Sequence, residues 1–180
     1  MTLLQSGDVW QRRNMADTGF KSPSSSNTGG WTTLSNCYSS NNSYATNTST
    51  TFVSGDVYNF AFGIPSGSSV DGIEVTAEFS AQFGGTTATI QLSISGDGGG
   101  AYTATKSDTV SGSTDTTRTY GGATDVWGAG PWSDANFADG TFYIKIEGKT
   151  SSVGIQCRLD HIQAKIYYSE GSQSGFFGLM

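Results

Sequence analysis

Residues 73–83 alternate apolar and polar side chains with a period of two. This period places successive side chains on opposite faces of a β-strand, one face buried and the other hydrated. The inward row that it predicts is Ile73, Val75, Ala77, Phe79, Ala81 and Phe83. Gly, Ser, Thr and Asn fill most of the segments between such rows, and these residues favour turns. The chain is therefore expected to be an all-β protein with a single core.

Other segments repeat the pattern. The further inward rows are Tyr58, Phe60 and Phe62; Ile90, Leu92 and Ile94; Phe142, Ile144 and Ile146; Val153, Ile155 and Cys157; and Ile162, Ala164, Ile166 and Tyr168. Two Thr-rich strands are expected around 102–110 and 115–120, and the phase of the last row slips near Asp160, which indicates a bulge. Many short strands separated by turn signals predict an antiparallel β-sandwich, specifically a jelly roll. The predicted core comprises Ile73, Val75, Phe79, Ile90, Leu92, Phe142, Ile144, Ile155, Ile162 and Ile166.

The 180 residues are enough for one domain. We expect an N-terminal arm and linker at 1–30, the sandwich at 31–168 and a C-terminal tail at 169–180. The Gly/Ser-rich stretch 22–30 is predicted to be a flexible linker. Both ends carry apolar side chains that are expected to contact neighbouring chains: Trp10, Phe20, Phe176, Phe177, Leu179 and Met180.

The composition favours a surface or structural role over catalysis. Charged residues make up 13% of the chain, against roughly 25% in an average domain. His161 is the single histidine and lies out of phase with the inward row, so no Ser-His-Asp triad is expected. Glu74 and Glu78 lie on one strand face about 13 Å apart, too far for the paired acid and base carboxylates of a glycosidase. We expect no catalytic residues and no cofactor.

The charge balance and the N-terminal sequence restrict the expected partners and location. A net charge of −6 disfavours nucleic acid as a partner. No stretch has the length and hydropathy of a membrane span, and the first residues lack the pattern of a secretory signal, so synthesis in a cytoplasm is expected.

Metal and disulfide chemistry stay open at this stage. Asp97, Asp134 and Asp139 lie in loops and could bind calcium, although turn formation explains them more simply. Cys37 and Cys157 could form a disulfide, but Cys157 also fits the inward phase of a buried strand.

Two tryptophans lie in a Gly- and Pro-containing segment, residues 121–140. Trp127 and Trp132 could close one end of the sandwich together with Phe137, which is the favoured interpretation because large aromatic side chains are mostly buried. Alternatively, they could stack on sugar rings, and the protein would then be a carbohydrate-binding module or an adhesin domain.

One longer pattern carries a resemblance. Residues 58–75 place an aromatic strand before Ile64-Pro65, a small turn and the start of the next strand. Together with residues 125–128 and 159–168, this resembles a β-sandwich module recurrent in tailed-phage virion structural proteins, over roughly residues 31–168. The resemblance implies capsid decoration or a tail- or fibre-associated role in the virion, with other virion proteins and copies of itself as partners. A host-surface glycan is a further partner under the adhesin alternative.

Overall fold

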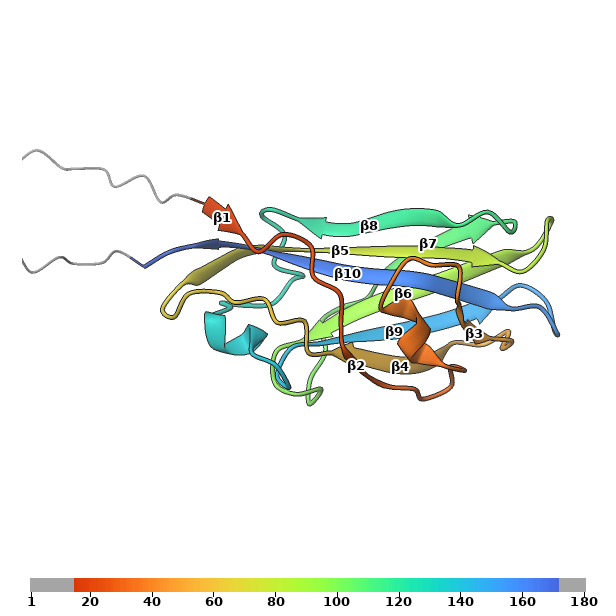
Figure 1. The fold of residues 1–180 in the computed structure, drawn as a ribbon, viewed down its shortest axis with the longest axis horizontal. Helices are drawn as coiled ribbons and strands as arrows, with labels where there is room; N and C mark the ends of the chain where they lie inside the picture. The colour runs from red at the N-terminus through yellow and green to blue at the C-terminus, as the bar shows by residue number, and fades with distance from the viewer. Residues whose placement is uncertain (1–14, 172–180) are drawn as a thin grey trace, which may run out of the picture.

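The computed structural model describes residues 15–171 as two five-stranded antiparallel sheets packed face to face (Figure 1). The strands are β1 (Met15–Asp17), β2 (Ser25–Asn27), β3 (Ala45–Asn47), β4 (Val53–Tyr58), β5 (Ser69–Ala81), β6 (Thr87–Ser95), β7 (Lys106–Ser111), β8 (Thr116–Gly122), β9 (Tyr143–Thr150) and β10 (Cys157–Ser169). Two short 3-10 helices, η1 (Leu34–Cys37) and η2 (Asp134–Phe137), interrupt the loops. The all-β sandwich is confirmed, and its assignment as a jelly roll stays a prediction.

One sheet has the order β1-β10-β5-β8, with β3 also paired to β10, and the other has the order β2-β4-β9-β6-β7. The two thirteen-residue strands, β5 and β10, pair along their whole length. The register of this pair shifts between Leu159 and His161, which confirms the irregularity predicted at Asp160.

The inner faces of the two sheets form the core. All predicted core residues are buried except Ile155, which is half-buried. Ile155 lies in the turn between β9 and β10, and its neighbour Val153 is 87% exposed, so the predicted row Val153–Cys157 is wrong at its first two positions. The prediction that Phe83 faces inward is also wrong. It lies two residues beyond the end of β5, in the β5–β6 turn, and is 53% exposed.

The aromatic row at 58–62 differs from its prediction as well. Tyr58 ends β4 on the outer face, where its ring stacks on Tyr143 with 4.5 Å between centroids. Beyond it, Asn59 and Ala61 adopt positive φ angles of 61° and 51°, which break the strand alternation. The buried rings of Phe60 and Phe62 therefore stack on each other, with centroids 5.2 Å apart, instead of continuing the strand.

Part of the expected N-terminal arm belongs to the sandwich. β1 pairs with β10 and β2 pairs with β4, so residues 22–30 contain a strand instead of the predicted flexible linker. Because Met15 is paired with Ser169, the two limits of the described chain lie side by side at one end of the molecule (Figure 1).

Candidate functional site

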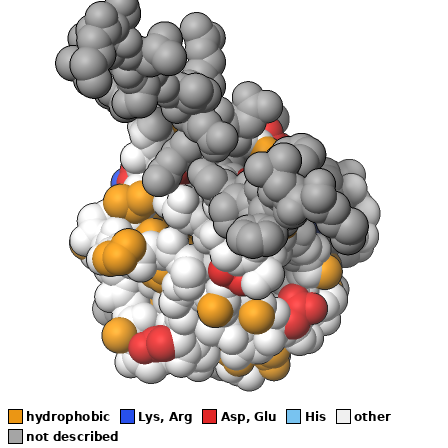
Figure 2. All heavy atoms as spheres, turned by 90° about the vertical axis from the view of Figure 1, so that its left-hand side faces the viewer, with side chains coloured by type: hydrophobic (Ala, Val, Ile, Leu, Met, Phe, Trp, Pro, Cys, Tyr) orange, Lys and Arg blue, Asp and Glu red, His pale blue; other side chains and the backbone are white. Residues whose placement is uncertain are grey.

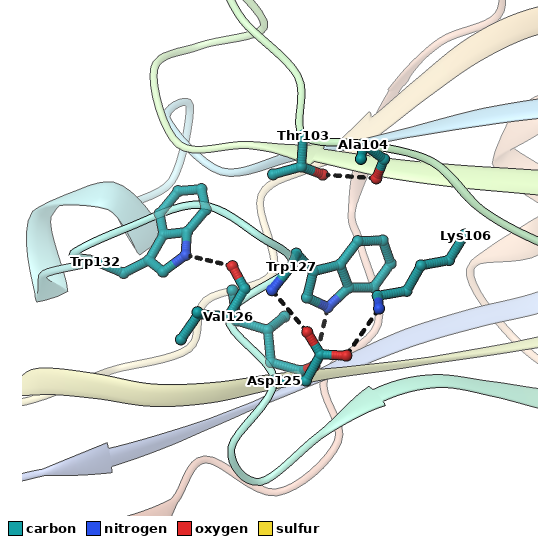
Figure 3. A network of polar contacts seen from close by, with 8 residues as sticks. Thr103, Ala104, Lys106, Asp125, Val126, Trp127 and Trp132 are labelled. Carbon is teal, nitrogen blue, oxygen red and sulfur yellow. Dashed lines mark hydrogen bonds and ion pairs between the residues drawn. The ribbon is translucent and has the colours of Figure 1, made fainter.

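The segment that follows β8 carries Trp127 and Trp132 (Figure 3). Trp127 is 2% exposed, and its indole Nε1–H donates to the carbonyl oxygen of Ile73 at 3.0 Å. Gly121 makes room for this ring, because a Cβ there would lie 2.7 Å from the Trp127 Nε1 and 2.1 Å from the Ile73 carbonyl oxygen. The predicted burial of Trp127 is confirmed.

Asp125 holds the Trp127 backbone in place. One carboxylate oxygen accepts the Trp127 backbone N–H at 2.7 Å, and the other lies 2.8 Å from the Lys106 Nζ (Figure 3). The hydrogen bond from Lys106 is the main reason that the pKa of Asp125 lies below its usual value. The Lys106–Asp125 pair is about one-third exposed, so it contributes to local order more than to global stability.

Trp132 is only half-buried and stands beside the turn that follows β6. Its indole N–H donates to the Val126 carbonyl oxygen at 3.0 Å (Figure 3). The ring packs against Gly96, where a Cβ would lie 2.5 Å from it. Behind it, Phe137 begins a buried aromatic cluster that includes Phe142, with ring centroids 5.0 Å apart.

A cavity of about 250 Å³ lies next to Trp132. Its walls come from two segments far apart in the sequence: residues 94–103, which contain the end of β6 and the Gly-rich turn, and the loop around η2. They are Ile94, Gly96, Asp97, Ala101, Tyr102, Thr103, Ala129, Trp132 and Asn136. The Tyr102 hydroxyl donates to Asp56 at 2.8 Å, and the Lys145 Nζ lies 3.7 Å from the centre of the Tyr102 ring.

Asp97 is fixed by the Gly-rich turn. Its Oδ1 accepts the Ser95 hydroxyl at 2.5 Å and the backbone N–H groups of Gly100 and Ala101 at 2.9 and 3.0 Å. The Ser95 hydrogen bond leads the causes that lower the pKa of Asp97. All of these contacts use Oδ1, and Oδ2 accepts no hydrogen bond from the described residues. Asp97 is one of the residues that line the cavity.

The other acidic candidates are engaged in loop hydrogen bonds. An oxygen of Asp134 accepts the Gly67 N–H at 3.2 Å, and one of Asp139 accepts the Ala61 N–H at 3.0 Å. These two aspartates also border a hollow of about 440 Å³ lined by Phe62 and Ile64. Within residues 15–171 no three His, Cys, Asp or Glu side chains are grouped to hold a metal ion.

The predicted strand carboxylates point outward, as expected, but they differ in their contacts. Glu74 accepts the Tyr167 hydroxyl at 2.6 Å and lies 3.0 Å from the Lys165 Nζ. Burial opposes its ionisation, yet the hydrogen bonds from Tyr167 and Lys165 prevail and lower the pKa of Glu74. Glu78 instead lies opposite His161 in the β5–β10 ladder.

His161 connects the N-terminal segment to β10. Its Nε2 lies 2.9 Å from the Ser22 Oγ, and burial lowers its pKa despite the nearby charge of Glu78. Cys37 and Cys157 are buried, free thiols, and burial raises the pKa of each to about 12.

The residues expected to contact partners divide into two groups. Phe20 is 39% exposed, and the Lys165 Nζ lies 4.5 Å from its ring centre. The other predicted contact residues lie outside the described residues: Trp10, Phe176, Phe177, Leu179 and Met180.

Sequence reasoning singled out Trp132 but missed Tyr102 and Asn136. Tyr102 was assigned to a strand that in the structure starts only at Lys106. The Gly-rich run at 96–100, directly before Tyr102, indicates a turn and could have shown that Tyr102 lies in a loop.

No family model and no curated protein matches the chain. Among solved structures it is similar to the carbohydrate-binding module TmCBM61, solved in complex with beta-1,4-galactotriose. The two share 13% identity, the match covers 84% of this chain and 86% of the other, and the TM-score is 0.35. At this distance the likeness carries no argument about a ligand of this chain. Among the described residues, no helix has the length and hydropathy needed to cross a bilayer.

Proposed function

We propose that this protein is a non-enzymatic structural component of a phage virion, a capsid-decoration or tail- or fibre-associated β-sandwich that is held to neighbouring chains at one end. One observation carries the proposal. Met15 pairs with Ser169, so the chain enters and leaves the sandwich at adjacent positions. The segments 1–14 and 172–180 are therefore attached to the same end. The first segment carries the apolar residue Trp10, and the second carries Phe176 and Phe177.

The surface of that end is compatible with a neighbouring chain. Figure 2 views this end, and the visible part carries separate hydrophobic side chains among acidic ones. The hollow beside Phe62 and Ile64 is formed by the loop between β4 and β5 and by the segment around η2. A mixed apolar and polar surface of this kind is typical of non-obligate protein interfaces. The resemblance of residues 31–168 to phage structural modules supports the same assignment.

Glycan binding is the second candidate, and the half-buried Trp132 beside a cavity favours it. Trp127 does not contribute a stacking face, because it is 2% exposed. The alternative therefore depends on Trp132 and not on a platform of two tryptophans.

Substitutions in the full-length chain test the structural proposal. We expect Phe176→Ser combined with Phe177→Ser, or Trp10→Ser, to leave the sandwich folded while reducing incorporation into purified particles at least tenfold, measured by quantitative mass spectrometry. Phe83→Ser is the matched control, because Phe83 is an exposed phenylalanine at the far end of β5. Normal incorporation of all the variants would contradict the proposal.

A further inference from the structure

The cavity beside Trp132 combines an aromatic wall with a fixed carboxylate. One wall is a tryptophan ring that is neither fully buried nor free to rotate, because its N–H is bonded to Val126 and its ring rests on Gly96. Another wall is the carboxylate of Asp97, whose orientation is fixed by three hydrogen bonds to one oxygen. Binding a ligand at this site therefore costs little side-chain entropy.

The chemistry of the walls restricts the ligand. A flat apolar ring favours a partner with a C–H face, and a carboxylate oxygen without a donor favours hydroxyl or N–H donors. The amide of Asn136 is already engaged, since it donates to the Gly96 carbonyl oxygen and accepts from Ser133. The carboxylate of Asp97 is thus the main acceptor offered to a ligand among the lining residues.

A cationic ligand is the competing class, because a carboxylate and an aromatic face both attract cations. The Tyr102 ring offers no face to such a ligand, since the Lys145 ammonium already lies 3.7 Å from its centre. That ammonium also places a positive charge against one of the cavity walls. A volume of about 250 Å³ lies somewhat below the range for drug-sized ligands, which matches one small ring instead of an extended molecule.

We propose that this cavity binds one neutral pyranose residue of a glycan, with the ring stacked on Trp132 and its hydroxyl groups donating to Asp97. The proposal rests on the glycan-binding candidate above and does not require assembly into a virion. It adds to that candidate the class of sugar and one residue, Asp97, that sequence analysis did not connect with it.

The test is a ¹H–¹⁵N NMR titration of the full-length chain with methyl glycosides of glucose, galactose, mannose and N-acetylglucosamine. Each is added to about 50 mM, where a ligand with a Kd of about 5 mM is close to saturating. At least one glycoside is expected to shift the backbone amides of 97–103 and the Trp132 indole signal. Tetramethylammonium chloride is titrated in parallel as the cationic probe.

Variants locate the site. Trp132→Ala is expected to weaken binding at least tenfold. Trp132→Phe should weaken binding less than Trp132→Ala, because a smaller aromatic face remains. Asp97→Asn should weaken binding about tenfold. Phe83→Ala, at the other end of β5, is the control and should leave the Kd unchanged. If Trp132→Ala does not fold, the ranking of Trp132→Phe and Asp97→Asn against the control decides the result.

Three outcomes would overturn the proposal: no glycoside shifts these amides, the shifts persist unchanged in the Trp132 and Asp97 variants, or only tetramethylammonium binds. Because the titration uses the isolated chain, none of these outcomes affects the assembly proposal. Conversely, if the Phe176 and Phe177 variants do not alter incorporation into particles, the sugar-site proposal is unaffected.

Discussion

Phe79 and Phe83 lie four residues apart at the end of β5 and occupy opposite environments. Phe79 is completely buried between the sheets, whereas Phe83 is 53% exposed in the following turn. We expect Phe79→Ala to lower the free energy of unfolding by about 3–5 kcal/mol, because it leaves a cavity in the core. Phe83→Ala should change it by less than about 0.5 kcal/mol. Urea unfolding of both variants measures the difference, and equal losses would refute the assignment of the inner face.

His161 should make stability depend on pH in a narrow window. Burial lowers its pKa in the folded protein, whereas the unfolded chain has a value near 6.5. Between these two values the unfolded state binds more protons, so the free energy of unfolding decreases as the pH falls. The contribution is complete above about pH 6.5 and is lost as the pH falls through the folded value. The groups that face this ring are Ser22, Glu78, Asp160 and Tyr38.

We expect His161→Gln to remove this part of the pH dependence, as measured by urea unfolding at pH 7.5, 6.5 and 5.5. The carboxylates with lowered pKa values, those of Glu74, Asp97 and Asp125, should act only at more acidic pH, since their usual values lie near 4. An unchanged pH profile in the variant would show that His161 is not the responsible group.

At the scale of elements, β9 depends on a glycine that faces a tryptophan. A Cβ at Gly148 would lie 2.3 Å from the ring of Trp31, which is 3% exposed and donates its indole N–H to the Ile146 carbonyl oxygen at 3.2 Å. Neither the strand nor the ring can move without breaking these contacts.

Gly148→Ala should therefore destabilise the protein by about 1–3 kcal/mol, as overpacked cores do. Gly84→Ala is the control, because a Cβ there would meet nothing within 4 Å. Thermal or urea unfolding compares the two, and a neutral Gly148→Ala would contradict the packing of Trp31 on β9.

The inward-facing residues of the strands could be predicted from the sequence, because burial of one face imposes a period of two. That period does not indicate where a strand ends, which is why the predictions that Phe83, Ile155 and Tyr58 face inward are wrong. In each case a turn or a positive φ angle changes the direction of the chain. The cavity could not be predicted, because only the packed sandwich brings Trp132 beside the turn that carries Asp97 and Tyr102.

At the scale of the whole molecule, the pairing of β1 with the end of β10 places residues 15 and 169 side by side at one end of the sandwich, the end that we propose is attached to neighbouring chains. The opposite end consists of the turns after β5, β7 and β9. This arrangement suits a module that is held on one side and presents the other to solvent. Strand β2 similarly pairs with β4, so residues 15–30 stabilise both sheets.

The mass of the native particle that the full-length chain forms or joins tests the central claim most directly. Native mass spectrometry, or light scattering after size exclusion, is applied to the full chain and to a chain limited to residues 15–171. We expect the full chain to purify in a particle many times heavier than one chain, and the shortened chain to be a folded monomer. A full chain that stays monomeric with its virion partners present, or a shortened chain that assembles equally well, would contradict the account.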